Sequence, residues 1–148
     1  MEDKYECLLV KPGEKPEKVT IGTELEDLQA AVGGYIEVLY PYADPVGIIC
    51  NEEGKLEGLP LNRALRDDNG EVYDVIAGDM LVIGLTDDGF ESLSPEMMEK
   101  YEKELHSPEC FVKMGKGIMA IPIPDEATDK AAREVEKSAA KKMSAPVI

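Results

Sequence analysis

The strongest constraint on the fold is the way short apolar runs alternate with turn residues along most of the chain. Each run has about the length of one β-strand, and clusters of Gly, Pro, Asn and Asp separate one run from the next. The predicted strands are Tyr5–Lys11, Lys18–Ile21, Tyr35–Tyr40, Val46–Cys50, Val72–Ile76, Met80–Leu85, Cys110–Met114 and Ile118–Ile123. We expect the first two to form a β-hairpin.

Two segments have the spacing of helices instead. Thr23 and Glu26 form a capping-box pattern, and Gly33 ends the apolar periodicity that follows, so a helix is predicted over Glu24–Val32. Ser94-Pro95 is typical of the start of a second helix, with Ser as N-cap and Pro in the first turn. The apolar stripe of this second helix consists of Met97, Met98, Tyr101 and Leu105.

The order of these elements predicts the fold class. Pro60–Arg66 is expected to add one or two helical turns between strands. An α+β domain over residues 1–124 follows, with a mostly antiparallel sheet and two helices packed on one side. Residues 125–148 are rich in Ala, Lys and Glu, and we expect a weakly helical or flexible tail there because Ala anchors a helix poorly.

The charge of the chain is strongly negative, −15 at pH 7, from 31 acidic and 16 basic side chains. All of it belongs to residues 1–124, because residues 125–148 carry five acidic and five basic side chains. Binding to a nucleic-acid backbone requires Lys and Arg that displace counterions, so we expect no direct nucleic-acid partner. The same charge disfavours membrane surfaces, and it either keeps the protein soluble or complements a basic protein partner.

Patterns typical of catalytic and metal sites are missing. His106, the one histidine, lies at the end of a charged helix and is more simply explained as a surface helix-end residue than as the base of a hydrolase-type dyad or triad. Cys110 lies four residues on, but without a second histidine the pair falls short of the four ligands of a zinc site. Cys7, Cys50 and Cys110 are widely spaced and imply no disulfide framework. The glycine patterns of phosphate loops and dinucleotide folds are absent, as is any run of about 18 apolar residues. We therefore expect a cytoplasmic protein with no metal, no cofactor and no membrane span.

A few polar residues set among apolar ones form the candidate binding site. Paired glycines before a strand allow a ligand to come close, and the solvent face of that strand carries a tyrosine and a glutamate. The guanidinium of Arg63 suits a phosphate or carboxylate, although in so acidic a domain it can equally pair with Glu37 or another carboxylate. The candidate ligand-binding residues are Gly34, Tyr35, Glu37, Asn51, Asn62 and Arg63.

The same residues carry a resemblance to a known family. The segments Val32–Val38 (VGGYIEV), Cys50–Lys55 (CNEEGK) and Leu59–Arg63 (LPLNR) are its clearest motifs, and Gly89–Ser94 also matches. Over roughly residues 5–112 the chain resembles an uncharacterised domain family of short proteins from phages, plasmids and other mobile elements. The resemblance implies a gene expressed in a bacterial cytoplasm, where small non-enzymatic proteins often counter host defence, and it implies no established activity.

Three functions remain in competition. The first is a small-molecule binding module that sequesters a nucleotide-like signal, with Tyr35 stacking on the ligand and Asn51, Asn62 and Arg63 donating hydrogen bonds. The second is an acidic inhibitor that mimics the charge of DNA and occupies a basic site on a host protein. The third, ranked last for want of a motif, is an enzyme with unrecognised carboxylate chemistry. A homo-oligomer built through exposed strand edges is compatible with all three.

Overall fold

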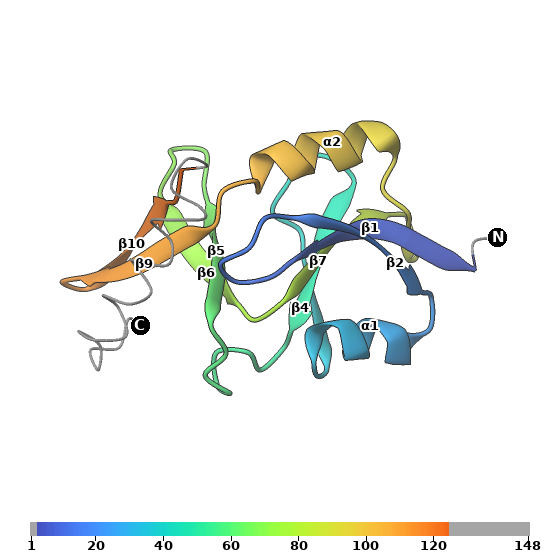
Figure 1. Cartoon of the computed structure of the whole chain (residues 1–148), viewed down its shortest axis with the longest axis horizontal. Helices are drawn as coiled ribbons and strands as arrows, with labels where there is room; N and C mark the ends of the chain where they lie inside the picture. The colour runs from blue at the N-terminus through green and yellow to red at the C-terminus, as the bar shows by residue number, and fades with distance from the viewer. Residues whose placement is uncertain (1–2, 125–148) are drawn as a thin grey trace.

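The centre of the molecule is an antiparallel sheet with the strand order β2-β1-β7-β4-β3, and the short β8 pairs with the end of β7 (Figure 1). The computed structural model describes residues 3–124. The strands of this sheet are β1 (Lys4–Val10), β2 (Glu17–Gly22), β3 (Ile36–Leu39), β4 (Val46–Asn51), β7 (Met80–Leu85) and β8 (Phe90–Glu91). The predicted hairpin between the first two strands is confirmed.

Two further strand pairs lie beyond one end of the central sheet (Figure 1). They are β5 (Leu61–Arg66) with β6 (Val72–Ala77), and β9 (Glu109–Met114) with β10 (Gly117–Pro122). Ala64 and Val75 of the first pair and Phe111 of the second form a small apolar cluster between them. The two pairs therefore pack against one another rather than extending the central sheet.

The two helices cover opposite faces of the central sheet (Figure 1). They are α1 (Leu25–Val32) and α2 (Pro95–Glu104). Successive side chains of a strand point to opposite faces. Met80 and Val82 of β7 accordingly pack in the cluster under α2, whereas Leu81 and Ile83 pack with α1. An α+β fold with a mostly antiparallel sheet is confirmed, but the prediction that both helices lie on one side is wrong, because β4 and β7 are apolar on both faces.

The prediction of helical turns over residues 60–66 is also wrong, since this segment is strand β5. Leu61 pairs with Ala77 and Ala64 with Val75, so two residues of β5 face the single residue Ile76 of β6. This is a β-bulge, which locally re-aims the side chains of the longer strand. Pairing with β6 overrides the helix-forming tendency of Leu, Ala and Arg in this segment.

The observed helix ends agree in part with those predicted from the sequence. Ser94 caps α2 as predicted and accepts a hydrogen bond from the main-chain N–H of Met97. The capping box of α1 is made by Glu24 and Asp27 rather than by the predicted Thr23 and Glu26. Gly33 ends α1 with φ 77°, a left-handed conformation that favours glycine. The predicted tail over residues 125–148 lies outside the described residues.

Candidate functional site

Arg63, one of the two residues in the β5 bulge, is 1% exposed and lies beside the end of α2. Its Nε and Nη2 donate to the carbonyl oxygen of Leu105 at 3.1 and 2.9 Å, and Nη2 also donates to that of Glu14 at 2.6 Å. Nη1 donates to the main-chain oxygen and the Oδ1 of Asn62 at 3.4 and 3.1 Å. A guanidinium has five N–H groups, so all of its donors are used.

The positive charge of Arg63 is therefore stabilised by hydrogen bonds to carbonyl oxygens. The expected salt bridge with Glu37 or another carboxylate does not form among the described residues. Burial lowers the pKa of Arg63 to about 10, and the negative charge of Glu109 opposes that effect. The guanidinium remains protonated at neutral pH, next to the negative end of the α2 dipole. Arg63 thus ties the last turn of α2 to β5 and to the turn after β1.

Asn62, the other bulge residue, is fully buried. Its side-chain Nδ2 donates to the carbonyl oxygens of Val10 and Gly78, each at 2.8 Å. Its Oδ1 accepts from Arg63. The pair of adjacent side chains therefore joins β5 to the end of β1, to the turn before β7 and to α2.

The remaining predicted residues gather at the β3–β4 end of the sheet. Asn51 donates to the carbonyl oxygen of Val32 and to Oε1 of Glu57, both at 3.3 Å, and accepts from the N–H of Glu53 at 2.8 Å. A Cβ at Gly34 would lie 2.8 Å from Nδ2 of Asn51, so only glycine allows this close approach. Tyr35, 67% exposed, and Glu37, also exposed, lie on the neighbouring segment and strand β3.

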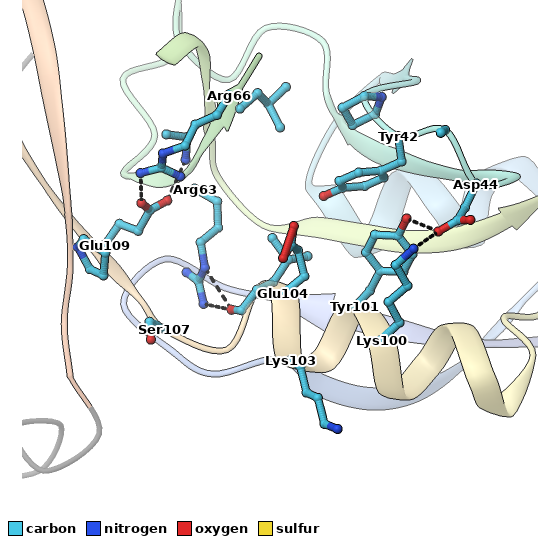
Figure 2. Close-up of a pocket in the computed structure, with 16 residues that line it drawn as sticks. Tyr42, Asp44, Arg63, Arg66, Lys100, Tyr101, Lys103, Glu104, Ser107 and Glu109 are labelled. Atoms are coloured by element: carbon cyan, nitrogen blue, oxygen red, sulfur yellow. Dashed lines mark hydrogen bonds and ion pairs between the residues drawn. The ribbon is translucent and has the colours of Figure 1, made fainter. Parts of the chain in front are cut away.

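The six predicted residues do not line one cavity. A cavity of about 600 Å³ lies beside α2, and we call it the α2 cleft (Figure 2). The α2 cleft is lined by Pro41, Tyr42, Ala43, Asp44, Arg63, Ala64, Leu65, Arg66, Lys100, Tyr101, Lys103, Glu104, Leu105, Ser107, Glu109 and Pro122. Of the six, only Arg63 is among them. A smaller cavity of about 430 Å³, at the end of α1, contains none of the six in its lining.

The α2 cleft stands apart from the rest of the molecule in its charge. Its lining contains four of the 11 basic side chains of residues 3–124 but only three of the 25 acidic ones. Two of the four cations, Arg63 and Arg66, come from β5, and the other two, Lys100 and Lys103, come from α2. An acidic domain therefore has one concave surface where positive charge is in slight excess.

One wall of the cleft is a tyrosine pair that α2 and the loop before β4 bring together. The ring centroids of Tyr42 and Tyr101 are 4.5 Å apart at a 48° tilt. The hydroxyl of Tyr101 donates to Asp44 at 2.7 Å, and Lys100 Nζ donates to the same oxygen at 2.5 Å (Figure 2). These two hydrogen bonds lower the pKa of Asp44, since they stabilise its ionised form. Burial, reinforced by the bond to Asp44, raises the pKa of Tyr101.

Tyr42 differs from Tyr101 because none of the described residues forms a hydrogen bond with its hydroxyl. Its ring lies against Tyr101, and the hydroxyl points across the cleft toward the side occupied by Glu104 (Figure 2). Burial raises the pKa of Tyr42, and the charge of Glu104 adds to the effect. The phenol therefore stays neutral and can both donate and accept a hydrogen bond within the cleft.

The opposite wall is built by Arg66 and Glu109. Nη2 of Arg66 lies 2.5 Å from Oε2 of Glu109, whose other oxygen accepts from the N–H of Ala64 at 2.8 Å. The Glu109 side chain is 6% exposed, whereas that of Arg66 is 37% exposed. Arg66 makes this one hydrogen bond among the described residues, so it has further N–H groups that face solvent. Glu109 thus fixes the position of a cation that remains accessible.

Sequence reasoning missed most of this cleft. Tyr101 was expected only in the apolar stripe of its helix, and it is 2% exposed as that expectation requires. Asp44 and Tyr101 are 57 positions apart in the chain, so no local spacing links them. The one available signal was the placement of Lys100 beside Tyr101 on a helix whose start was clear.

Within residues 3–124 no three His, Cys, Asp or Glu side chains are arranged so that they could hold a metal ion. Burial raises the pKa of Cys7 to about 12 and that of Cys50 to about 11, so both thiols stay protonated at neutral pH. None of the described helices combines the length and apolar character needed to cross a membrane.

The fold and the cleft together define a small α+β domain with a charged cavity of ligand size on its α2 face. The chain belongs to the family described as a domain of unknown function, DUF3846, whose match covers residues 5–106. No curated protein and no solved structure matches the chain. The match ends just after α2, so the matched residues of this chain include β5 and both tyrosines of the cleft but not β9 and β10.

Proposed function

We propose that this protein is a non-enzymatic binding protein that sequesters a small nucleotide-like ligand in the α2 cleft. The observation that carries the proposal is the concentration of cations and tyrosines in a cleft of an otherwise acidic domain. The cleft volume of about 600 Å³ lies within the range typical of small-molecule sites. A planar base and an anionic phosphate are the two features that such a lining recognises.

The geometry suggests how the two ends of such a ligand are held. Arg66 and Lys100 have donors beyond those used by Glu109 and Asp44, and their side chains are 37% and 55% exposed. They are the proposed phosphate contacts. The hydroxyl and ring of Tyr42 are the proposed contacts of the base. Lys103 extends away from the cleft in Figure 2 and pairs with Glu99, so we assign it no contact.

The residues predicted from the sequence take different places in this proposal. Asn62 and Arg63 position the floor of the cleft, because their hydrogen bonds hold β5 against the end of α2. Gly34, Tyr35, Glu37 and Asn51 lie at the β3–β4 end of the sheet and are not among the residues that line the cleft. The proposed ligand class is unchanged, but its site moves from the β3 surface to the α2 face.

We extend the proposal to the setting that the sequence resemblance implies. A gene of a phage or plasmid expressed in a bacterial cytoplasm would benefit from a protein that removes a nucleotide signal of host defence. A cleft that binds without turning over its ligand is sufficient for that role. The support for this step is the resemblance of the VGGYIEV, CNEEGK and LPLNR segments, together with the charge of the cleft.

Thermal unfolding with mono-, di- and triphosphate nucleotides and with cyclic nucleotides tests the proposal. A ligand present at 100 times its dissociation constant stabilises the folded state by about 2.7 kcal/mol, which a thermal shift detects readily. We expect stabilisation by at least one nucleotide and a loss of that stabilisation in Lys100→Ala. Inorganic phosphate alone should stabilise less, because it lacks the base that Tyr42 would contact.

Lys55→Ala is the matched control for Lys100→Ala. Lys55 is 59% exposed and pairs with Asp74, so its ion pair resembles that of Lys100 with Asp44 but lies outside the cleft. Equal effects of the two variants on ligand binding would contradict the site. Absence of stabilisation by every nucleotide at millimolar concentration would overturn the function. Salt-sensitive capture of a basic host protein would then favour the alternative of an acidic inhibitor.

A further inference from the structure

Ion pairs within the lining of the α2 cleft offset two of its four cations. Lys100 binds Asp44, and Arg66 binds Glu109, so neither pair adds net charge. Each carboxylate also accepts a second hydrogen bond, Asp44 from a tyrosine hydroxyl of the cleft wall and Glu109 from a main-chain N–H of β5. A ligand that displaced either carboxylate would leave that donor without its acceptor, so both pairs are fixed features of the site.

The other charged groups of the lining leave the cleft close to neutral. Lys103, which accounts for the slight excess of cations, pairs with Glu99 outside the lining and extends away from the cleft (Figure 2). Arg63 keeps its charge, but oxygen atoms of the folded chain use all of its donors. Glu104 is exposed, and no described residue forms a hydrogen bond or an ion pair with its side chain. The charges of Arg63 and Glu104 therefore offset one another.

The rest of the domain adds negative charge around the cleft. Residues 3–124 carry 25 acidic and 11 basic side chains, a net charge of −14. This field repels an approaching anion, and the repulsion grows with the charge of the anion. The free N–H groups of Arg66 and Lys100 stabilise a bound anion, but their number is fixed. An anion of low charge is therefore favoured over a polyanion.

We propose that the ligand of the α2 cleft is a nucleotide with a singly charged phosphodiester, as in a cyclic mononucleotide, and that Glu104 selects it against terminal phosphates. The inference rests on the proposed function, because it names the ligand class of the same cleft. A phosphodiester presents its two free oxygens to Arg66 and Lys100 and carries one negative charge. A terminal phosphate carries about 1.5 to 2 negative charges near neutral pH, and the additional charge finds no free cation and is repelled by Glu104.

Calorimetric titration of the full-length chain tests the selection by charge. The ligands are the 3′,5′-cyclic nucleotide and the 5′-mono-, di- and triphosphates of one base, in EDTA, because Mg²⁺ would offset part of the phosphate charge. At low salt we expect the cyclic nucleotide to bind about tenfold or more tightly than the triphosphate, since like charges brought together are costly. In about 1 M salt, where the screening length is about 3 Å, the difference should shrink.

Glu104→Gln is the test variant, because it removes the unpaired charge and keeps the shape of the side chain. The ratio of the triphosphate to the cyclic-nucleotide dissociation constant should fall by about threefold or more, since the extra phosphate charge is no longer repelled. Glu96→Gln is the matched control, an exposed glutamate eight positions earlier on α2 and outside the cleft lining. Eight positions span about 12 Å of helix, more than the screening length of about 8 Å at physiological salt. The ratio should stay unchanged in this control.

The possible failures of the two proposals are distinguishable. Absence of binding by every nucleotide would overturn the proposed function, and this inference with it. A triphosphate that binds the wild type as tightly as the cyclic nucleotide would overturn this inference alone. A preference for the cyclic nucleotide that persists in high salt and in Glu104→Gln would show selection by shape and would also overturn it. Equal effects of Glu104→Gln and Glu96→Gln would remove Glu104 from the selection.

Discussion

The buried floor of the α2 cleft and its solvent-exposed rim each contain an arginine, and the two arginines differ in burial and in how many of their donors are used. Arg63 and Arg66 are three positions apart in one strand. On the floor, Arg63 is 1% exposed and donates all five of its N–H groups to oxygen atoms of the folded chain. On the rim, Arg66 is 37% exposed at its side chain and makes one ion pair, with Glu109.

This contrast separates stability from binding. A buried guanidinium whose donors are all used cannot bind a ligand without leaving carbonyl oxygens unpaired, and each unpaired buried acceptor is costly. A half-exposed guanidinium with free donors can bind an anion at little cost to the fold. Substitutions on the floor should therefore change the free energy of unfolding, whereas substitutions on the rim should change ligand affinity.

The largest effect is expected for Arg63→Met. The variant leaves the carbonyl oxygens of Leu105 and Glu14 and the Oδ1 of Asn62 without their donor. Because each such acceptor costs about 1–3 kcal/mol, we expect the free energy of unfolding to fall by about 3–5 kcal/mol. Urea denaturation measures this loss. A change below about 1 kcal/mol, the size expected for a surface ion pair, would contradict the contrast.

Asn62→Ala should have the second largest effect on stability. The variant removes two hydrogen bonds of 2.8 Å to the carbonyl oxygens of Val10 and Gly78 in a fully buried position. We expect a loss of about 2–3 kcal/mol, with no direct effect on ligand contacts. Asn51→Ala is its control, because its own donated bonds are 3.3 Å long, and it should lose less in the same urea experiment.

The strands themselves were predicted from the sequence more accurately than which of their faces are buried. The apolar runs in β1, β4 and β7 correctly predicted strands, since their patterns depend only on local spacing. Runs that are apolar at every position also indicate burial on both faces, and that signal would have placed helices on both sides of the sheet. β5 was missed because its strand character depends on pairing with β6 and not on its own residues.

The candidate site shows the same limit in sharper form. Arg63 was singled out correctly as an unusual cation in an acidic domain, but its partners Leu105 and Glu14 are 42 and 49 positions away. The role of Arg63 could not be predicted, because every residue has a main-chain carbonyl oxygen. Residue type therefore does not show which of these oxygens accept hydrogen bonds from Arg63. The tyrosine wall was missed for a related reason, since Tyr42 comes from a loop and meets Tyr101 only after α2 packs on the sheet.

Arg66→Met tests the rim directly. The Arg66–Glu109 pair is partly exposed, so we expect the free energy of unfolding to fall by less than about 1 kcal/mol. Affinity for a stabilising nucleotide should fall by about tenfold or more, because a charge-assisted hydrogen bond contributes about 1.5–3 kcal/mol. Calorimetric titration of the variant measures this, and Arg66→Lys should retain part of the affinity. Unchanged affinity in Arg66→Met would remove Arg66 from the site.

The smallest effect is expected at Asp44, where the rim contributes to stability through a titrating group. Hydrogen bonds from Lys100 and Tyr101 lower the pKa of Asp44 below its ordinary value of 3.8. A carboxyl whose pKa is lowered by folding stabilises the folded state at every pH above its ordinary pKa. This contribution disappears as the pH falls through the lower pKa of the folded state. Asp44→Asn should therefore be less stable than the wild type near neutral pH, and the difference should close in acid below pH 3.8.

Urea denaturation of the wild type and of Asp44→Asn, from neutral pH into acid, measures how the difference between their free energies of unfolding closes. Lys103→Gln is the control, because it breaks an ion pair with Glu99 on the outer surface of α2 and leaves Asp44 intact. It should lose stability below pH 3.8 as the wild type does. Since the Asp44 side chain is partly exposed, salt should shrink the difference at neutral pH. A gap between wild type and Asp44→Asn that stays constant into acid would mean that the two hydrogen bonds do not favour the ionised carboxylate, and that this part of the rim acts by shape alone.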